Sequence, residues 1–198
     1  TDPERKIAEE TNVRLYMTES PEKIYPDKKM EVYDFVPEDG TENEVVNLYP
    51  GLTYQTMEGF GGAVTDAAGY VFSMMDKDQK EELLDMYFGE EGMHYNRVRL
   101  HMDSCDFSTR LYSAVEDEED ENLDTFSFAH TEKYMIPFLE AAQQRAGKKL
   151  KVMLSAWSPP EFMKTNGSRI GGGSLKKEYY SRWAKYLCRY VEEFEKRG

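Results

Sequence analysis

One stretch constrains the fold of this chain more than any other, a short apolar segment that runs into a long loop rich in Pro and Gly. Residues 150–156, LKVMLSA, show no helical period and two prolines follow them closely, so the segment is predicted to be a buried strand. Trp157 leaves its carboxyl end, where parallel α/β folds place ligand sites. A Trp at this point can equally cap the core beneath a structural loop. The loop itself carries three polar candidates, Lys164, Asn166 and Arg169.

The composition bounds the class of protein. The 198 residues are 39% apolar and 13% aromatic, which is enough to bury a core. The net charge of -13 argues against nucleic acid as a partner, and no apolar run reaches the ~18 residues of a membrane span. Two cysteines and three scattered histidines predict neither a disulfide framework nor a metal site, and no cofactor is expected.

The first residue is not Met and no signal-peptide pattern follows it, so we expect a processed or trimmed start. A secreted and a cytoplasmic location both stay open. Residues 1–53 are predicted to contribute a few β-strands to a small side domain, too few to stand alone. Val13–Thr18 alternates as a strand, and residues 45–48 form a second candidate that ends in the turn signal Tyr49-Pro50-Gly51.

Residues 54–198 are predicted to repeat the unit strand–helix three times, which indicates a right-handed parallel α/β fold. The expected strands are 57–63, 94–101 and 150–156. The main helix signals are capping by Thr65 or Asp66, a capping box at Asp76 and Gln79, a stop at Gly147 and a final amphipathic helix with Trp183 and Cys188 in the core. An open sheet and a closed barrel both begin this way, and the long aromatic loops favour the barrel.

The second strand carries Arg97 and Arg99 on one face and Val98 and Leu100 on the other. A buried Arg needs a carboxylate partner, and for Arg97 we favour an ordinary structural ion pair. The acidic run 116–121 is interpreted as a solvated loop, because it lacks the ligand spacing of a calcium loop.

Three motifs, in order, resemble one family. EGFGGAVTDAA, RLHMDSCDFSTR and SAWSPPEFMKTNG, the last followed by GGGSLKKEYYSRWAKY, closely resemble glycoside hydrolase family 30, the glucocerebrosidase-like enzymes and their bacterial branch. The resemblance covers about residues 54–198. It implies a (β/α)8 TIM barrel with a β-sandwich side domain. The chain would then hold the first three βα units of the barrel, residues 54–198, and the first strands of the side domain, residues 1–53.

The resemblance also assigns substrate-binding roles. Arg99 matches the arginine that holds the nucleophilic carboxylate, and Asp106 and Trp157 match the residues that hydrogen-bond sugar hydroxyls. Within the same motifs lie three secondary candidates, Phe107, His101 and Asn166. Departures from the family occur at His101, where the human branch has Pro, and at two further positions, Asp103 and Ala156. They leave the sugar specificity open.

The family's catalytic carboxylates are not predicted in this chain. Retaining glycosidases use two carboxylates about 5–5.5 Å apart. In the family one belongs to an Asn-Glu-Pro motif after strand 4, a tripeptide absent here, and the nucleophile ends strand 7. The carboxylates present near strand ends belong to strands 1 to 3 and would not flank a sugar; they are Glu58, Asp103, Asp106 and Glu161.

Two functions are therefore considered. The first is the N-terminal part of a retaining β-glycosidase for β-linked glucosides, completed by the remainder of the barrel from the same parent chain or a second one. In that case the isolated 198-residue chain is expected to be inactive. The second is a non-catalytic carbohydrate-binding or assembly protein that kept half a barrel. We favour the first, because three βα units alone leave open sheet edges and an unburied face.

Overall fold

The computed structural model describes residues 13–18, 28–34, 49 and 51–197, and it divides the chain into two compact units, Thr1–Gln55 and Thr56–Gly198. In the first unit β1 (Val13–Thr18) pairs antiparallel with β2 (Lys28–Tyr33). β1 matches the predicted strand, whereas β2 was not predicted. The strand expected at residues 45–48 lies outside the described residues, so the β-sandwich remains an expectation.

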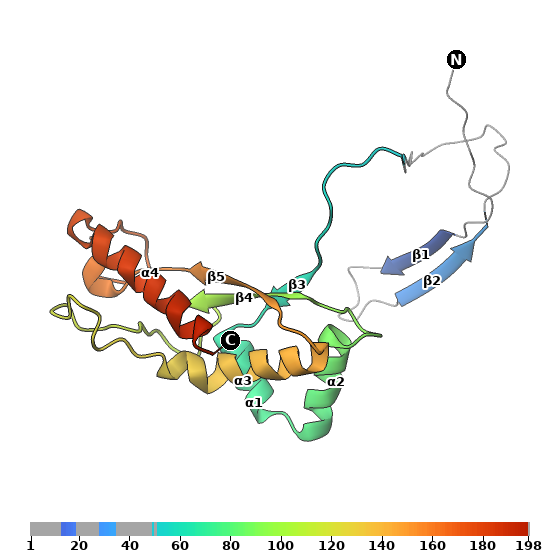
Figure 1. Cartoon of the computed structure of the whole chain (residues 1–198), viewed down its shortest axis with the longest axis horizontal. Coiled ribbons are helices and arrows are strands. Elements are labelled where there is room, and N and C mark those ends of the chain that lie inside the picture. Colours follow the sequence, from blue (N-terminus) through green and yellow to red (C-terminus); the bar gives the residue numbers. More distant parts are fainter. Residues whose placement is uncertain (1–12, 19–27, 35–48, 50, 198) are drawn as a thin grey trace, which may run out of the picture. The chain divides into compact units, whose positions relative to one another are not determined.

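The second unit contains a three-stranded parallel sheet in the order β3-β4-β5. The strands are β3 (Gly61–Ala63), β4 (Arg97–Met102) and β5 (Lys151–Ala156). In Figure 1 their arrows point the same way, so their carboxyl ends share one edge of the sheet. All three overlap the predicted segments and end within one residue of them, but β3 begins four residues and β4 three residues later than expected. The predicted parallel pairing is confirmed. β3 is shorter than expected.

The glycines before and within β3 are required by the backbone. Gly61 pairs with Arg97, and a Cβ on Gly61 would overlap the carbonyl oxygen of Arg97. Gly59 has a φ of 143°, which side chains other than hydrogen rarely allow. The predicted close backbone approach is therefore confirmed.

Four helices accompany the sheet, namely α1 (Asp66–Met74), α2 (Lys77–Phe88), α3 (Ala129–Ala146) and α4 (Tyr180–Glu195), with short 3-10 turns at Glu161–Met163 and Lys177–Tyr179. Thr65 caps α1, the capping box of Asp76 and Gln79 starts α2, and Gly147 ends α3 in the left-handed conformation. α1, α2 and α3 lie on one side of the sheet (Figure 1). No helix in the described part of the chain is long and apolar enough to cross a membrane.

The core lies between the sheet and these helices. Val98 and Leu100 point into it, with 3% and 1% of their surface exposed. Around them pack the residues of the α1–α3 side, Phe72, Leu84, Phe88, Met135, Leu139 and Ala142. A second cluster joins the end of β4 to α4 through Met102, Phe128, Tyr186 and Tyr190. β4 therefore shows the predicted alternation of a buried and an open face from Arg97 to Leu100, after which His101 and Met102 are both buried.

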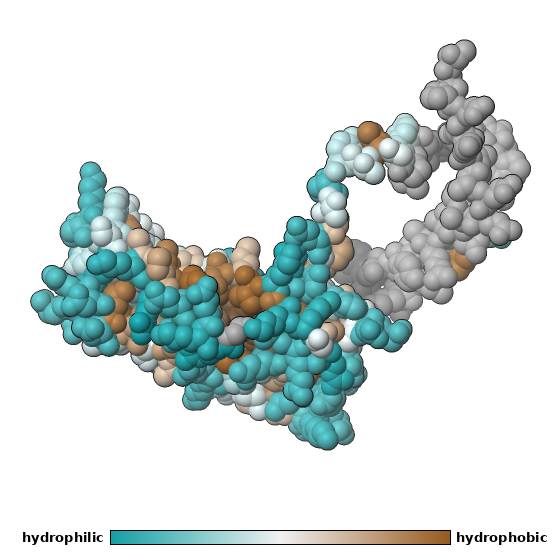
Figure 2. Space-filling view, in the orientation of Figure 1, coloured by the Kyte–Doolittle hydropathy of each residue, from teal (hydrophilic) through white to brown (hydrophobic). Residues whose placement is uncertain are grey.

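Two expectations about burial are wrong. β5 is not a buried strand, because Val152 and Met153 are 40% and 58% exposed. It is the edge of the sheet, and Met153, paired with Arg99, lies on the face that no described helix covers. Figure 2 shows an apolar patch in this region. On α4, Cys188 is exposed and Trp183 only half-buried, because α4 turns Tyr186 and Tyr190 inward, toward Asp103 after β4.

The acidic run also differs from the expectation of a purely solvated loop. Asp120 is buried and accepts hydrogen bonds from the backbone N–H of Asp124 and from the N–H and hydroxyl of Thr125. These donors, the Thr125 hydroxyl first, lower the pKa of Asp120 to about 2. Arg182 of α4 donates to the carbonyls of Asp117 and Glu118 and ties the run to the helix.

Candidate functional site

Arg99, in the middle of β4, and Trp157, directly after β5, are brought together on adjacent strands. The Arg99 guanidinium lies 5.4 Å from the centre of the Trp157 ring, within the range of a cation–π contact. Arg99 Nη2 donates to Ser155 Oγ at 2.8 Å. Trp157 is 43% exposed, so it does not cap the core. The two side chains therefore form an open, polar and aromatic surface beside β4 and β5.

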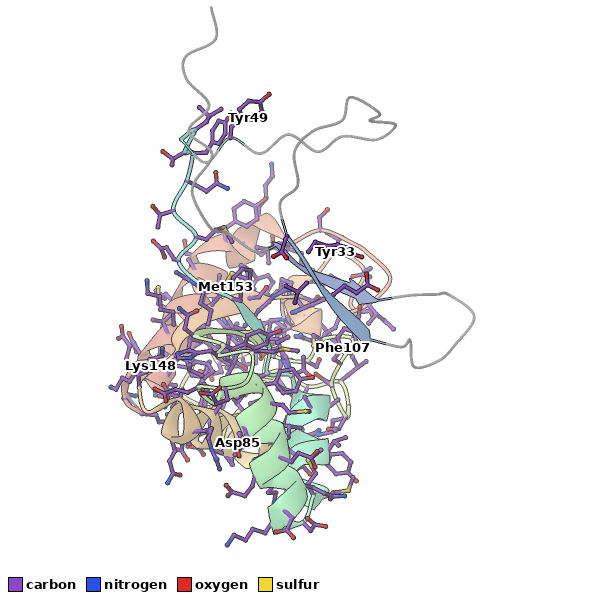
Figure 3. All side chains as sticks on the ribbon, turned by 90° about the vertical axis from the view of Figure 1, so that its right-hand side faces the viewer. Tyr33, Tyr49, Asp85, Phe107, Lys148 and Met153 are labelled. Carbon is purple, nitrogen blue, oxygen red and sulfur yellow. The ribbon has the colours of Figure 1, made fainter. Side chains whose placement is uncertain are left out.

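Asp106 and Phe107 lie in the turn that follows β4. The turn is held by a hydrogen bond from Ser108 N to Cys105 O, and Cys105 N donates to Ser108 Oγ at 2.9 Å. Both side chains point to solvent: Asp106 is exposed and pairs with no described residue, and Phe107 is 60% exposed. Figure 3 labels Phe107 and, on the sheet, Met153. The turn thus offers a free carboxylate and an apolar ring near the strand ends.

His101 does not belong to this open surface. It is 3% exposed, and its Nε2 accepts from the backbone N–H of Asp66 at 2.9 Å. Its Nδ1 lies 2.5 Å from the carbonyl oxygen of Asp103 and donates to it. Burial lowers the pKa of His101, so the ring is neutral. Both nitrogens are occupied, and His101 joins β4 to the start of α1 without reaching a substrate.

The Asn166 side chain forms its hydrogen bonds within its own loop. Its amide Nδ2 donates to the carbonyl of Ile170 at 3.0 Å, and Oδ1 accepts from Ser168 N at 3.4 Å. The side chain is exposed at the outer part of the loop. The structure gives no contact between Asn166 and Arg99, Trp157 or Asp106.

Arg97 forms the ion pair predicted for it, with Glu58. Lys151 joins the same carboxylate at 3.3 Å. Arg97 and Lys151 are the first residues of β4 and β5, so this cluster lies at the amino ends of the strands. The hydrogen bond from Arg97 is the main cause that lowers the pKa of Glu58. Among the described residues, the ion pairs of Glu58 are with Arg97 and Lys151 and do not include Arg99.

Asp103 is the centre of a buried polar network that the sequence reasoning did not identify. Its carboxylate accepts from the hydroxyls of Tyr186 and Tyr190, from Ala114 N and from Arg169 Nη1 at 2.6–3.2 Å. Burial raises the pKa of Asp103, and the Arg169 guanidinium and the two hydroxyls oppose that shift. The sequence signal was present: two tyrosines four residues apart face one side of a helix.

Asp66 was predicted only as a helix cap, yet it is fully buried. Its Oδ2 accepts from the N–H and hydroxyl of Thr109 at 2.7 and 2.8 Å, and its Oδ1 lies 3.0 Å from His130 Nε2. Burial raises the pKa of Asp66, but the Thr109 donors and His130 outweigh it and hold the pKa below its ordinary value. Asp66 thereby fixes the loop after β4 to α1.

A cavity of about 690 Å³ opens between this loop and the start of α3. Tyr112, His130 and Tyr134 are among its lining residues. None of the predicted site residues lines it. The predicted sugar surface is thus the open edge of the sheet and is distinct from this cavity. Within the described residues no group of three or more His, Cys, Asp or Glu side chains is placed to hold a metal ion.

Comparison with known proteins identifies the family of the chain. Residues 57–198 match the family model "Glycosyl hydrolase family 30 TIM-barrel domain". The chain is 33% identical to the lysosomal acid glucosylceramidase of Mus musculus over 159 residues, which cover 78% of the chain and 31% of that protein. It is 29% identical to an endo-1,6-beta-D-glucanase of Neurospora crassa over 155 residues, 75% of the chain and 32% of that protein.

A solved structure gives the same result for the fold. SrfJ from Salmonella typhimurium superposes with a TM-score of 0.76 at 33% identity, covering 85% of this chain and 38% of that one. The chain thus spans about a third of the length of these relatives. The parallel sheet, the order of its helices and the family match over 57–198 lead to one conclusion: the chain belongs to glycosyl hydrolase family 30 and carries part of its TIM-barrel domain.

Proposed function

We propose that this chain forms the sugar-binding side of a β-glycosidase that acts on β-linked glucosides. Two of its relatives are named for such substrates, a glucosylceramidase and an endo-1,6-beta-D-glucanase. Their shared chemistry is a β-glucosidic bond, attached to a lipid in one name and to a second sugar in the other. The proposed substrate class is therefore a β-glucoside.

One observation carries the proposal, the contact of Arg99, on the open face of β4, with Trp157, which directly follows the carboxyl end of β5. TIM-barrel enzymes place their active sites at this end of the barrel. Neither side chain serves the hydrophobic core, since both are exposed. An exposed Trp ring beside the Arg99 guanidinium supports binding of a ligand that has both polar groups and an apolar face. A sugar ring is such a ligand.

Each exposed group has a proposed role. The Trp157 indole N–H donates to a hydroxyl of the terminal sugar, and the Asp106 carboxylate accepts from another. A hydrogen bond to a charged group is worth roughly 1.5–3 kcal/mol, so Asp106 contributes substantially to affinity. Phe107 lies next in the chain and offers an apolar surface at the rim.

Arg99 is proposed to orient the nucleophilic carboxylate of a retaining mechanism. Its guanidinium has five N–H donors, and the bond to Ser155 uses one of them. The remaining donors can hold a carboxylate in a fixed plane and keep it ionised for attack on the anomeric carbon. That carboxylate and the general acid are proposed to come from the remainder of the barrel. The uncovered face that carries Met153 and Arg99 is where we place it.

The test compares the intact parent protein with the isolated 198-residue chain on an aryl β-glucoside. We expect the intact protein to release the β-anomer first, as seen by NMR of fresh product, and the isolated chain to release nothing above background. Circular dichroism of the chain controls for folding. Release of the α-anomer would contradict the retaining mechanism, and hydrolysis by the folded chain would contradict the assignment of catalysis to other strands.

A further inference from the structure

Arg169 is an arginine buried inside the junction of two loops. Its side chain is only 3% exposed, although it comes from the tip of the loop that follows β5. The guanidinium makes three bonds to the chain just after β4. Nη1 donates to Asp103 Oδ2 at 3.2 Å, Nη2 to the Ser104 carbonyl at 3.1 Å and Nε to Ser104 Oγ at 3.1 Å. The planar fork of Arg therefore spans both residues.

The loop that carries Arg169 is closed at its base by backbone pairing. Lys164 and Leu175 form an antiparallel bridge, and Lys176 N donates to Met163 O at 2.9 Å. The buried Lys164 ammonium donates to the carbonyl of Arg169 at 3.2 Å. Gly171, Gly172 and Gly173 all have φ between 76° and 81°, a run that lets the chain return to the base. The loop is thus a closed unit with one inserted side chain.

Asp103 is built to receive that side chain. Its φ of 59° lies in the left-handed region, which Asp and Asn adopt more readily than most residues. Tyr186 and Tyr190 of α4 hold its carboxylate, and its own N–H donates to Tyr190 Oη at 3.0 Å. The Asp103 carboxylate is therefore held in place by α4, through contacts that do not involve Arg169.

We propose that Arg169 and Asp103 are positioning residues, a latch that locks the loop after β5 onto the turn after β4. Ser104, which accepts hydrogen bonds from Arg169, lies two residues before Asp106. The loop that carries Arg169 begins at Trp157. The latch would hold the two proposed sugar-binding groups in one geometry. The proposal deepens the proposed function and rests on it for the effect on catalysis.

The rival explanation is an ion pair that only stabilises the fold. The two differ when both charges are removed together. A single change at Arg169 leaves a buried carboxylate without its partner, which destabilises any protein. The double variant Asp103→Asn with Arg169→Met leaves no unpaired charge. Asn tolerates the left-handed backbone and can still accept from the tyrosine hydroxyls, and Met replaces the apolar stem of Arg.

The experiment uses the intact parent protein and three readouts: melting temperature, amide hydrogen exchange and kcat/KM on an aryl β-glucoside. The matched control is Arg145→Met, which removes an arginine that pairs with Glu81 and Asp85 in the helical layer. Asp85 lies on α2, whereas Met153 lies on β5 and Phe107 in the turn after β4; Figure 3 labels all three. We expect the double variant to melt within a few degrees of the wild type.

Its amides in 104–108 and 164–176 should exchange at least about tenfold faster, since the latch no longer holds them closed. Its kcat/KM should fall by about ten- to a hundredfold, because a displacement of substrate-binding groups by about 1 Å can lower the rate by that much. The Arg145 control should change neither. Unchanged exchange in these segments, or intact kcat/KM with fast exchange, would overturn the latch. So would loss of cooperative folding in the double variant.

If the wild-type protein hydrolyses no β-glucoside, the proposed function fails while the exchange data still decide on the latch. Slow exchange in the wild type and fast exchange in the double variant, confined to these two segments, would then support it. Equal exchange in both proteins would reject it.

Discussion

Replacing Arg99 with Lys in the intact protein should lower kcat by at least about tenfold, which corresponds to roughly 1.4 kcal/mol of barrier. Lys retains one positive charge but loses the planar fork, so it cannot hold a carboxylate in a fixed plane. The proposed partner of Arg99 is the nucleophile. The loss should therefore appear in the chemical step.

The same substitution should have little effect on stability. Arg99 makes two contacts on an exposed face, the hydrogen bond to Ser155 and the stacking on Trp157. A hydrogen bond contributes about 0.5–1.5 kcal/mol and an exposed cation–π contact about 0.5–1 kcal/mol. Lys can retain part of both, so we expect a net loss of about 1 kcal/mol or less. A loss of 1 kcal/mol lowers Tm by about 2–4 °C in a protein of 150–250 residues and by less in a larger one, so the Tm of the intact protein should fall by only a few degrees.

The assay measures kcat and Tm on one preparation of each variant. Arg97→Lys is the matched control, because Arg97 lies on the same face of the same strand and already has its carboxylate partner, Glu58, at the amino end of the strand. It should leave kcat unchanged. The reasoning is refuted if Arg99→Lys lowers Tm strongly while kcat per folded molecule stays intact, because that pattern belongs to a structural ion pair.

Three further predictions concern other residues. Asp106→Ala should lower kcat/KM by about ten- to a few hundredfold, at ~1.4 kcal/mol per decade, while the exposed Glu161→Ala should not; equal effects would reject the role of Asp106. The pKa of Asp66 is lower in the folded state than its ordinary value of 3.8, so Asp66 stabilises the fold above that value and loses this contribution as the pH falls through the pKa of the folded state. Asp66→Asn should therefore make Tm less dependent on pH at the acid end of a Tm–pH curve. Leu100→Ala should cost about 2–5 kcal/mol in a denaturant titration and the exposed Cys188→Ala less than about 0.5 kcal/mol, whereas similar costs would contradict the burial described.

Local signals predicted the strands and helix ends well. The alternation of Val98 and Leu100 with two arginines fixed the faces of β4, and the caps at Thr65, Asp76 and Gly147 depend on short-range hydrogen bonds that a sequence pattern reveals. The parallel order followed from the repeated strand–helix unit. Here sequence and structure agree because the causes are local.

The failures have a non-local cause. An apolar segment such as β5 does not reveal whether a neighbour will cover both of its faces, so its exposure at Met153 was not predicted. The predicted apolar stripe of α4 runs through Trp183 and Cys188, but the structure buries another face of the helix, which carries Tyr186 and Tyr190. The contacts of these tyrosines with Asp103, far away in the sequence, decide which face is buried.

The candidate site shows the same division. Arg99 and Trp157 were both assigned to the substrate site by resemblance to the family, and the structure brings them into contact. His101 lies two residues after Arg99 on β4, and this spacing suggested that both side chains belong to one site. The start of α1 instead covers His101, which accepts a hydrogen bond from the backbone N–H of Asp66. Arg169 was noted only as a polar loop residue, because its partners lie about 65 positions earlier in the chain.

The central claim is that Asp106 and Trp157 bind one terminal sugar of a β-glucoside. A crystal structure of the intact protein with a non-hydrolysable β-glucoside tests it most directly. The account predicts the Trp157 indole nitrogen and an Asp106 carboxylate oxygen within about 2.6–3.2 Å of hydroxyls on the same sugar ring, with Arg99 beside a carboxylate from another strand. A sugar bound in the cavity by Tyr112 and His130, with Asp106 and Trp157 free, would contradict it.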